Sequence, residues 1–209
     1  MLKTSPALLE RTEELVELGR ELGYLRIGAY TLLATILHRR PDLIKELEHI
    51  VTLLKRIKTD LEGTGDADNA YELIGYIVSW VPEWADKLEV LIGAFAHINL
   101  APRRGFELRE AYSSLAMLLT PWLELADRAE ELNGITAAAK YGIAYAYKLL
   151  SEIMRMRSDL RTGPGRFIGP FRKIEQASGG NLAGPAFEAL TGIVSVRPDL
   201  ADKLDAFSE

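Results

Sequence analysis

Six basic residues and two phenylalanines share one short stretch of the chain, "RMRSDLRTGPGRFIGPFRK" at residues 155–173. The basic residues are Arg155, Arg157, Arg161, Arg166, Arg172 and Lys173, the rings are Phe167 and Phe171, and Asp159 is the single acid. Arginine binds phosphate or carboxylate through paired N–H donors, and a Phe ring can anchor or stack on a ligand. The stretch is therefore the candidate site for a partner or an anion. The alternative is a solvated loop whose rings pack against neighbouring helices.

The charge of the whole chain limits what this stretch can bind. A formal net charge of −5 argues against a protein that coats nucleic acid over its entire surface, but leaves room for a local basic patch. If the stretch binds DNA or RNA, phosphate contacts predict that the affinity falls steeply as salt increases. Arg103 and Arg104 join the patch only if folding brings them near.

Two further stretches have the spacing of metal sites. Glu46-Leu47-Glu48-His49 contains the Glu-x-x-His of di-iron helix bundles, but such a site needs two copies and further carboxylates, so we expect a solvated helix face. "DLEGTGDADNAYE" at 60–72 resembles a calcium loop, except that Tyr71 stands where the loop needs a carboxylate. We expect its acids, Asp66 or Asp68, to cap the next helix instead.

The remaining chemistry-bearing patterns are missing from the sequence. There is no cysteine, no phosphate-binding loop with Lys-Ser/Thr, and no G-x-S-x-G, while His38 and His97 have no visible partners. We therefore expect a protein that is not an enzyme, with no catalytic residue, no metal and no cofactor.

One pattern recurs five times along the chain. "AYTLLATILHRRPDL" at 29–43 aligns without gaps to the stretches that start at 70, 111, 146 and 186. Each copy opens with Ala and an aromatic residue, and these aromatics are Tyr30, Tyr71, Tyr112, Tyr147 and Phe187. Aliphatic residues follow at helical spacing, which predicts one buried stripe on a helix.

A proline ends the helix in three of the copies. Pro41, Pro82 and Pro198 fall eleven residues after their aromatics, and Ser158 takes this place in the fourth copy. Proline cannot continue a helix but suits the first turn of the next one, and serine is a good N-cap. Each copy therefore predicts a helix, a tight turn and a second helix. In the third copy Pro121 comes two residues early, so we expect a different turn.

These repeats predict an all-α protein of about ten helices, arranged as five helix–turn–helix repeats of roughly 40 residues. We expect one repeat domain over residues 1–209, either an α-solenoid or a compact helical bundle, with a capping helix at 5–22. The Gly-Pro pairs in the fourth repeat predict that its second helix does not form normally, leaving an irregular basic loop at 161–184.

The repeat length and the helix–turn–helix pattern resemble HEAT-type α-helical repeats. The Pro-Asp-Leu turns and the Leu-rich helix pairs also resemble small helical accessory proteins encoded beside formate dehydrogenase and heterodisulfide-reductase-type complexes. The first resemblance implies a scaffold that recognises other proteins. The second implies an accessory subunit of a redox complex.

We therefore expect a non-enzymatic scaffold or adaptor that binds another protein. Two alternatives stay open: a coat-like protein that packs nucleic acid through residues 155–173, and the accessory subunit of a redox complex. The N-terminal stretch lacks the uncharged core of a secretory signal, and no apolar run is long enough to span a bilayer, so we expect a cytoplasmic protein. A homo-oligomer is a further alternative.

Overall fold

The computed structural model describes residues 10–61, 67–99, 105–180 and 182–208. Within these residues the chain forms α-helices and short 3-10 helices and no strand, which confirms the all-α prediction. The ten α-helices are α2 (Thr12–Leu22), α3 (Arg26–Arg39), α4 (Leu47–Leu61), α5 (Ala67–Trp80), α6 (Leu88–Asn99), α7 (Gly105–Leu119), α8 (Ala129–Ala138), α9 (Ile143–Met156), α10 (Ile168–Ala177) and α11 (Ala183–Val196). Helix α2 ends where the predicted capping helix ends.

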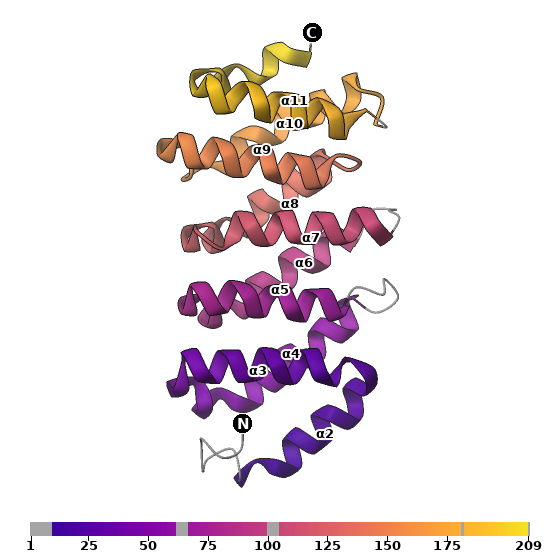
Figure 1. Cartoon of the computed structure of the whole chain (residues 1–209), viewed down its shortest axis with the longest axis vertical. Coiled ribbons are helices and arrows are strands. Elements are labelled where there is room, and N and C mark those ends of the chain that lie inside the picture. Colours follow the sequence, from indigo (N-terminus) through magenta and orange to yellow (C-terminus); the bar gives the residue numbers. More distant parts are fainter. Residues whose placement is uncertain (1–9, 62–66, 100–104, 181, 209) are drawn as a thin grey trace. The chain divides into compact units, whose positions relative to one another are not determined.

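Each repeat is built from one long first helix and a second segment that begins as a 3-10 helix. The first helices are α3, α5, α7, α9 and α11 (Figure 1). The 3-10 segments are η2 (Gly23–Leu25), η3 (Pro41–Glu46), η4 (Pro82–Lys87), η5 (Leu123–Arg128), η6 (Ser158–Leu160), η7 (Pro164–Phe167) and η8 (Pro198–Ser208). Each of η3, η4, η5, η6 and η8 follows a first helix, while η2 precedes α3 and η7 leads from η6 into α10. This arrangement is compatible with a helical-repeat fold.

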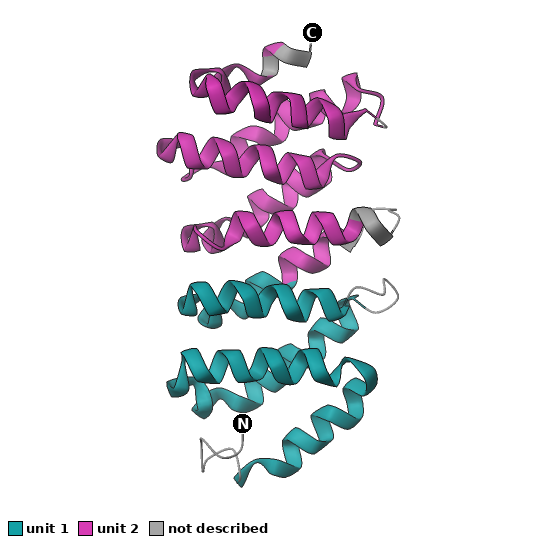
Figure 2. Ribbon diagram, in the orientation of Figure 1, with its two compact units in different colours: residues 1–92 teal, residues 93–209 magenta. Residues whose placement is uncertain are grey.

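The chain divides into two compact units, residues 1–92 and 93–209, with the boundary inside α6 (Figure 2). In the first unit α3 packs against α5, while α2 packs against both α3 and α4. In the second unit α9 lies between α7 and α11, and α10 lies between α8 and η8. First helices therefore contact first helices, and second segments contact second segments, within each unit.

The turn between the two helices has the same backbone geometry in all five repeats. Its central residue is Arg40, Val81, Trp122, Arg157 or Arg197, with φ between −133° and −129° and ψ between 74° and 91°. A following proline favours this extended conformation, and three repeats have one. The expectation of a different turn in the third repeat is therefore wrong for the central residue. Pro121 shortens the helix instead: α7 stops at Leu119, because proline offers no N–H for another helical bond.

The aromatic residue that opens each repeat anchors it to the preceding segment. Tyr71, Tyr112, Tyr147 and Phe187 are buried, as predicted, and Tyr30 is half-buried. The Tyr30 and Tyr71 hydroxyls donate to the backbone oxygens of Leu15 in α2 and Leu54 in α4. These hydrogen bonds satisfy the one polar atom of each ring, so the rest of the ring can be buried at low cost.

An arginine at the turn links neighbouring repeats in each unit. Arg40 binds Asp42 of its own turn and Asp86 of the next, and Arg157 binds Asp159 and Asp202 in the same way, with N–O distances between 2.6 and 3.0 Å. These ion pairs raise the pKa of both guanidinium groups and lower the pKa of Asp42 and Asp159.

We expect Arg157→Met to destabilise the second unit at neutral pH. Because Arg157 holds the pKa of Asp159 below its ordinary value of 3.8, the stabilisation is present above that value and is lost as the pH falls through the lowered one. Urea unfolding at several pH values between about pH 6 and about pH 2 measures the free energy of unfolding of both chains. The difference between the variant and the parent chain should become smaller as the pH falls. Arg155→Met is the control, since Arg155 pairs only with Glu152 on its own helix. A difference that persists at the lowest pH would contradict the assignment.

No helix in the described part of the chain is long and apolar enough to cross a membrane. The single repeat domain over 1–209 stays a prediction.

Candidate functional site

The basic stretch at 155–173 is folded, and the predicted irregular loop at 161–184 is wrong. After η6 and η7 the chain enters α10 at Ile168, so the fourth repeat does have its second helix. Pro170 is the third residue of α10, where the N–H that proline lacks has no partner inside the helix anyway. The Gly-Pro pair therefore starts this helix rather than preventing it.

The two rings of the stretch lie in the core rather than on the surface. Phe171 is fully buried, with its ring 5.9 Å from that of Phe167 and 5.1 Å from that of Phe187. Phe167 is also buried. Both rings serve the packing of α10 against α11, so neither can stack on a ligand without opening the core.

Three of the basic residues are held by groups of the protein itself. Arg155 binds Glu152, and Arg157 binds Asp159 and Asp202. Arg161 donates to the backbone oxygen of Met154 at 2.9 Å, and its guanidinium lies 5.2 Å from the centre of the Trp122 ring. Arg166, Arg172 and Lys173 are exposed, and Arg166 borders a hollow of about 350 Å³ beside Asp202. Of the eight predicted residues, Arg155, Arg166, Arg172 and Lys173 are thus exposed, and Arg155 is held by Glu152.

The other sequence candidates are accounted for as follows. Glu46 and His49 are exposed on either side of the junction between η3 and α4, in agreement with a solvated face. Of the calcium-like stretch, Asp60 pairs with Arg56 on its own helix and Tyr71 is buried. Glu62, Thr64, Gly65 and Asp66 lie outside the described residues, as do Arg103 and Arg104.

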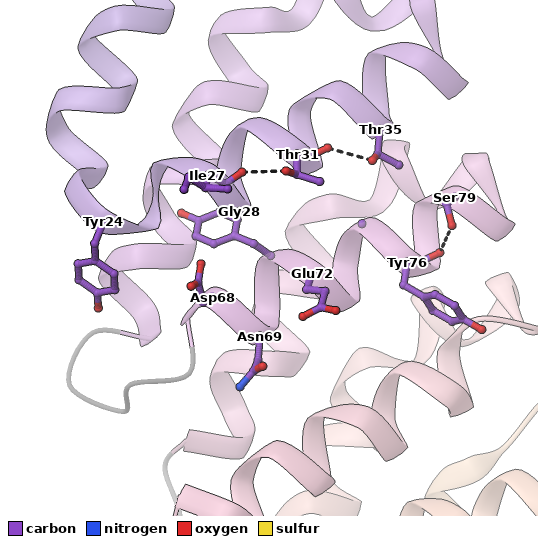
Figure 3. Close-up of a pocket in the computed structure, with 12 residues that line it drawn as sticks. Tyr24, Ile27, Gly28, Thr31, Thr35, Asp68, Asn69, Glu72, Tyr76 and Ser79 are labelled. Atoms are coloured by element: carbon purple, nitrogen blue, oxygen red, sulfur yellow. Dashed lines mark hydrogen bonds between the residues drawn. The ribbon is translucent and has the colours of Figure 1, made fainter. Parts of the chain in front are cut away.

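A groove lies between α3 and α5 in the first unit (Figure 3). Its volume is about 600 Å³. The residues that line it are Tyr24, Ile27, Gly28, Thr31, Thr35, Asp68, Asn69, Tyr71, Glu72, Gly75, Tyr76 and Ser79. Gly28 allows a close approach of the two helices, because a Cβ there would lie only 3.1 Å from the Cβ of Tyr71. A Cβ on Gly75 would make an ordinary contact with Leu32 at 3.8 Å.

Large apolar side chains border the groove. Tyr24, Ile27 and Tyr76 are 78%, 72% and 48% exposed. Trp80 follows Tyr76 by one helical turn, is 66% exposed, and has its ring centre 6.1 Å from that of Tyr76. Aromatic residues concentrated on an exposed face are typical of protein-binding surfaces.

Among the described residues that line the groove, the only charged groups are two carboxylates. Asp68 and Glu72 are exposed one turn apart on α5, and neither has an ion-pair partner among the described residues. The hydroxyls of Thr31, Thr35 and Ser79 instead donate to backbone oxygens of their own helices, as the dashed lines in Figure 3 show. The groove thus offers apolar surface and negative charge.

Sequence reasoning missed this groove, because its residues come from two helices whose contact the sequence does not state. Gly28 and Gly75 were the available signal, since a glycine within a helix often marks a close approach. Comparisons of the chain with protein-family models, with curated proteins and with solved structures find no match.

Proposed function

We propose that this protein is a non-enzymatic helical-repeat scaffold, with a HEAT-like arrangement of helix pairs, that binds a partner protein in the groove between α3 and α5. The proposal rests on one observation: a groove bordered by exposed aromatic rings carries two carboxylates that have no ion-pair partner among the described residues. The partner's binding segment should therefore combine an apolar side chain with at least one lysine or arginine. A cytoplasmic location stays a prediction.

The charge and the aromatic rings have separate roles in this proposal. The apolar contacts with Tyr76 and Ile27 supply affinity, because aromatic and aliphatic anchors dominate protein interfaces. The carboxylates of Asp68 and Glu72 select a cationic segment and speed its association. Binding should therefore weaken as salt increases, without disappearing.

The test is capture of partners from the native source, followed by affinity measurement with the purified partner. We expect Tyr76→Ala to weaken binding at least tenfold, since truncating an aromatic anchor typically costs more than about 1.4 kcal/mol. Asp68→Lys combined with Glu72→Lys should reduce the association rate more than it increases the dissociation rate.

Matched controls are available in the second unit. Met117 is 64% exposed on α7, and Glu124 is exposed on η5. Met117→Ala and Glu124→Lys repeat the same kinds of change away from the groove and should leave the affinity unchanged. If the groove variants and the control variants lose equal affinity for the partner, the groove is not the binding site.

The two alternative functions have less support in the geometry. A coat-like protein that packs nucleic acid would bind through residues 155–173, but the rings there are buried and three arginines are already bonded within the protein. For an accessory subunit of a redox complex, no specific observation favours that partner over another. Both stay predictions.

A further inference from the structure

Helix α11 has an apolar stripe that no described element covers. Residues at helical spacing along one side of it are all exposed: Leu182, Pro185, Ala189, Gly192, Ile193 and Val196. Ile193 is 39% exposed and Val196 is 77% exposed. A repeat whose outer face is exposed to water normally presents polar residues there, and this stripe contains none.

The preceding repeat shows what such a stripe binds. The corresponding residues of the fourth repeat lie forty positions earlier, where α11 packs against α9: Gly142, Leu149 and Ile153 are buried, whereas Met156, the counterpart of Val196, is exposed. A Cβ on Gly142 would lie 2.7 Å from the Phe187 ring, and a Cβ on Gly184 would lie 3.0 Å from the Tyr145 ring. Ile153, the counterpart of Ile193, is completely buried.

The first unit repeats this relation. Gly28, the counterpart of Pro185, approaches Tyr71 of α5, and Ile36, the counterpart of Ile193, is completely buried. In both units the stripe of a first helix, as far as the position of Ile193, is therefore the contact surface for the next first helix and its aromatic residue. Arg39 and Met156, the counterparts of Val196, are exposed.

The turn after α11 has an incomplete ion-pair cluster. Arg40 and Arg157 each bind two aspartates, one of them in the following repeat, and their side chains are only 25% and 26% exposed. Arg197 binds Asp199 alone through Nε and Nη2, and its side chain is 62% exposed. Among the described side chains, none takes beside Arg197 the place that Asp86 and Asp202 take in the other two clusters.

We infer that the α11 stripe and Arg197 form a docking surface for a helix–turn segment of a partner protein, built like this chain's own repeats and carrying an aspartate after its turn. The stripe would bind the apolar face of the partner's helix, and the aspartate would bind Nη1 of Arg197. This surface lies in the second unit and does not depend on the proposed groove in the first.

A second copy of this chain fits the surface less well. In a symmetric dimer with parallel α11 helices, the two Arg197 side chains would face each other. If a second copy packed its first repeat on the stripe, Lys45 would lie beside Arg197. Lys45 is at the repeat position that Asp86 and Asp202 occupy in their own repeats. Charge complementarity thus favours a different protein with an acidic turn.

The first experiment needs no natural partner. The full chain is extended by a short Gly-Ser linker and a second copy of residues 178–208, which supplies a helix and an aspartate of the required kind. We expect a stronger helical signal in circular dichroism and a rise in melting temperature of about 5 °C or more, each relative to the unextended chain. Arg197→Ala should reduce this gain in the extended chain while leaving the unextended chain nearly unchanged. An extended chain with no gain in either signal overturns the inference.

The second experiment identifies the partner. Proteins captured from the native source by the full chain are compared with those captured by Val196→Asp, with Val16→Asp on exposed Val16 of α2 as the matched control. We expect one protein whose affinity falls at least tenfold with Val196→Asp and with Arg197→Glu. Replacing the partner's aspartate by lysine should restore binding to Arg197→Glu.

Two results would overturn this assignment. One is a partner whose binding is unaffected by both α11 variants. The other is a dimer of the chain, seen by sedimentation, that Val196→Asp dissociates, because the surface would then bind a second copy. Tyr76→Ala in the groove should leave this interaction unchanged, which separates it from a failure of the proposed groove function.

Discussion

Tyr71→Ala should destabilise the first unit by about 3–5 kcal/mol, the usual cost of truncating a large buried aromatic residue. The Tyr71 ring is almost completely buried in α5, it contacts the position of Gly28 on α3, and its hydroxyl donates to the oxygen of Leu54 on α4. Removing it therefore weakens the contacts of α5 with both preceding helices. Such a loss is a large fraction of the stability of an ordinary domain.

Urea unfolding and amide hydrogen exchange together test this expectation. Exchange should accelerate in α3, α4 and α5, and much less in α9 and α11 of the other unit. Tyr71→Phe is the control: it keeps the ring and removes only the hydrogen bond, at a cost of about 0.5–1.5 kcal/mol. If the two variants are equally stable, the ring does not carry the packing that the structure assigns to it.

Phe171→Ala should destabilise the second unit by a similar amount, about 3–5 kcal/mol. The sequence made Phe171 a candidate ligand anchor, whereas the structure places its ring between those of Phe167 and Phe187 in a fully buried cluster. Truncation would leave a cavity where α10 packs against α11. The variant should therefore unfold at lower urea concentration.

Arg172→Ala is the matched control, since Arg172 is the next residue along α10 and is exposed. It should change the stability by no more than about 0.5 kcal/mol. If Phe171→Ala has no larger effect than Arg172→Ala, the ring is not part of the core and becomes again a candidate for ligand binding.

The sequence by itself determined the helices and the repeat. Residues such as Leu33 and Ile74 recur at the same distance after each aromatic, and both are completely buried. Helical periodicity and the proline at the turn are local properties, because they depend on side-chain direction and on backbone sterics within a few residues. They therefore predicted the all-α fold, the burial of four of the five aromatics and the turns at Pro41, Pro82, Ser158 and Pro198.

Predictions from local sequence patterns were wrong or incomplete where two segments distant in the sequence pack together. The Gly-Pro pair at Gly169 and Pro170 predicted an interrupted helix, but a proline within the first turn costs no helical hydrogen bond, and burial of Phe171 stabilises α10. The sequence showed the positive charge of the basic stretch, but it did not show which acidic residues bind it. Asp202, which binds Arg157, is 45 residues away in the sequence and is brought close only by the packing of η8.

Only the tertiary structure decided which surfaces are available for binding. The groove is lined by residues of α3 and α5 that packing brings together, and the α11 stripe is exposed because no described helix covers it. Ile36 of α3 and Ile153 of α9 are just as apolar in the sequence as Ile193, but both are completely buried, on helices that pack against the next first helix. Exposure depends on which helix packs against which, and local sequence periodicity carries no information about that choice.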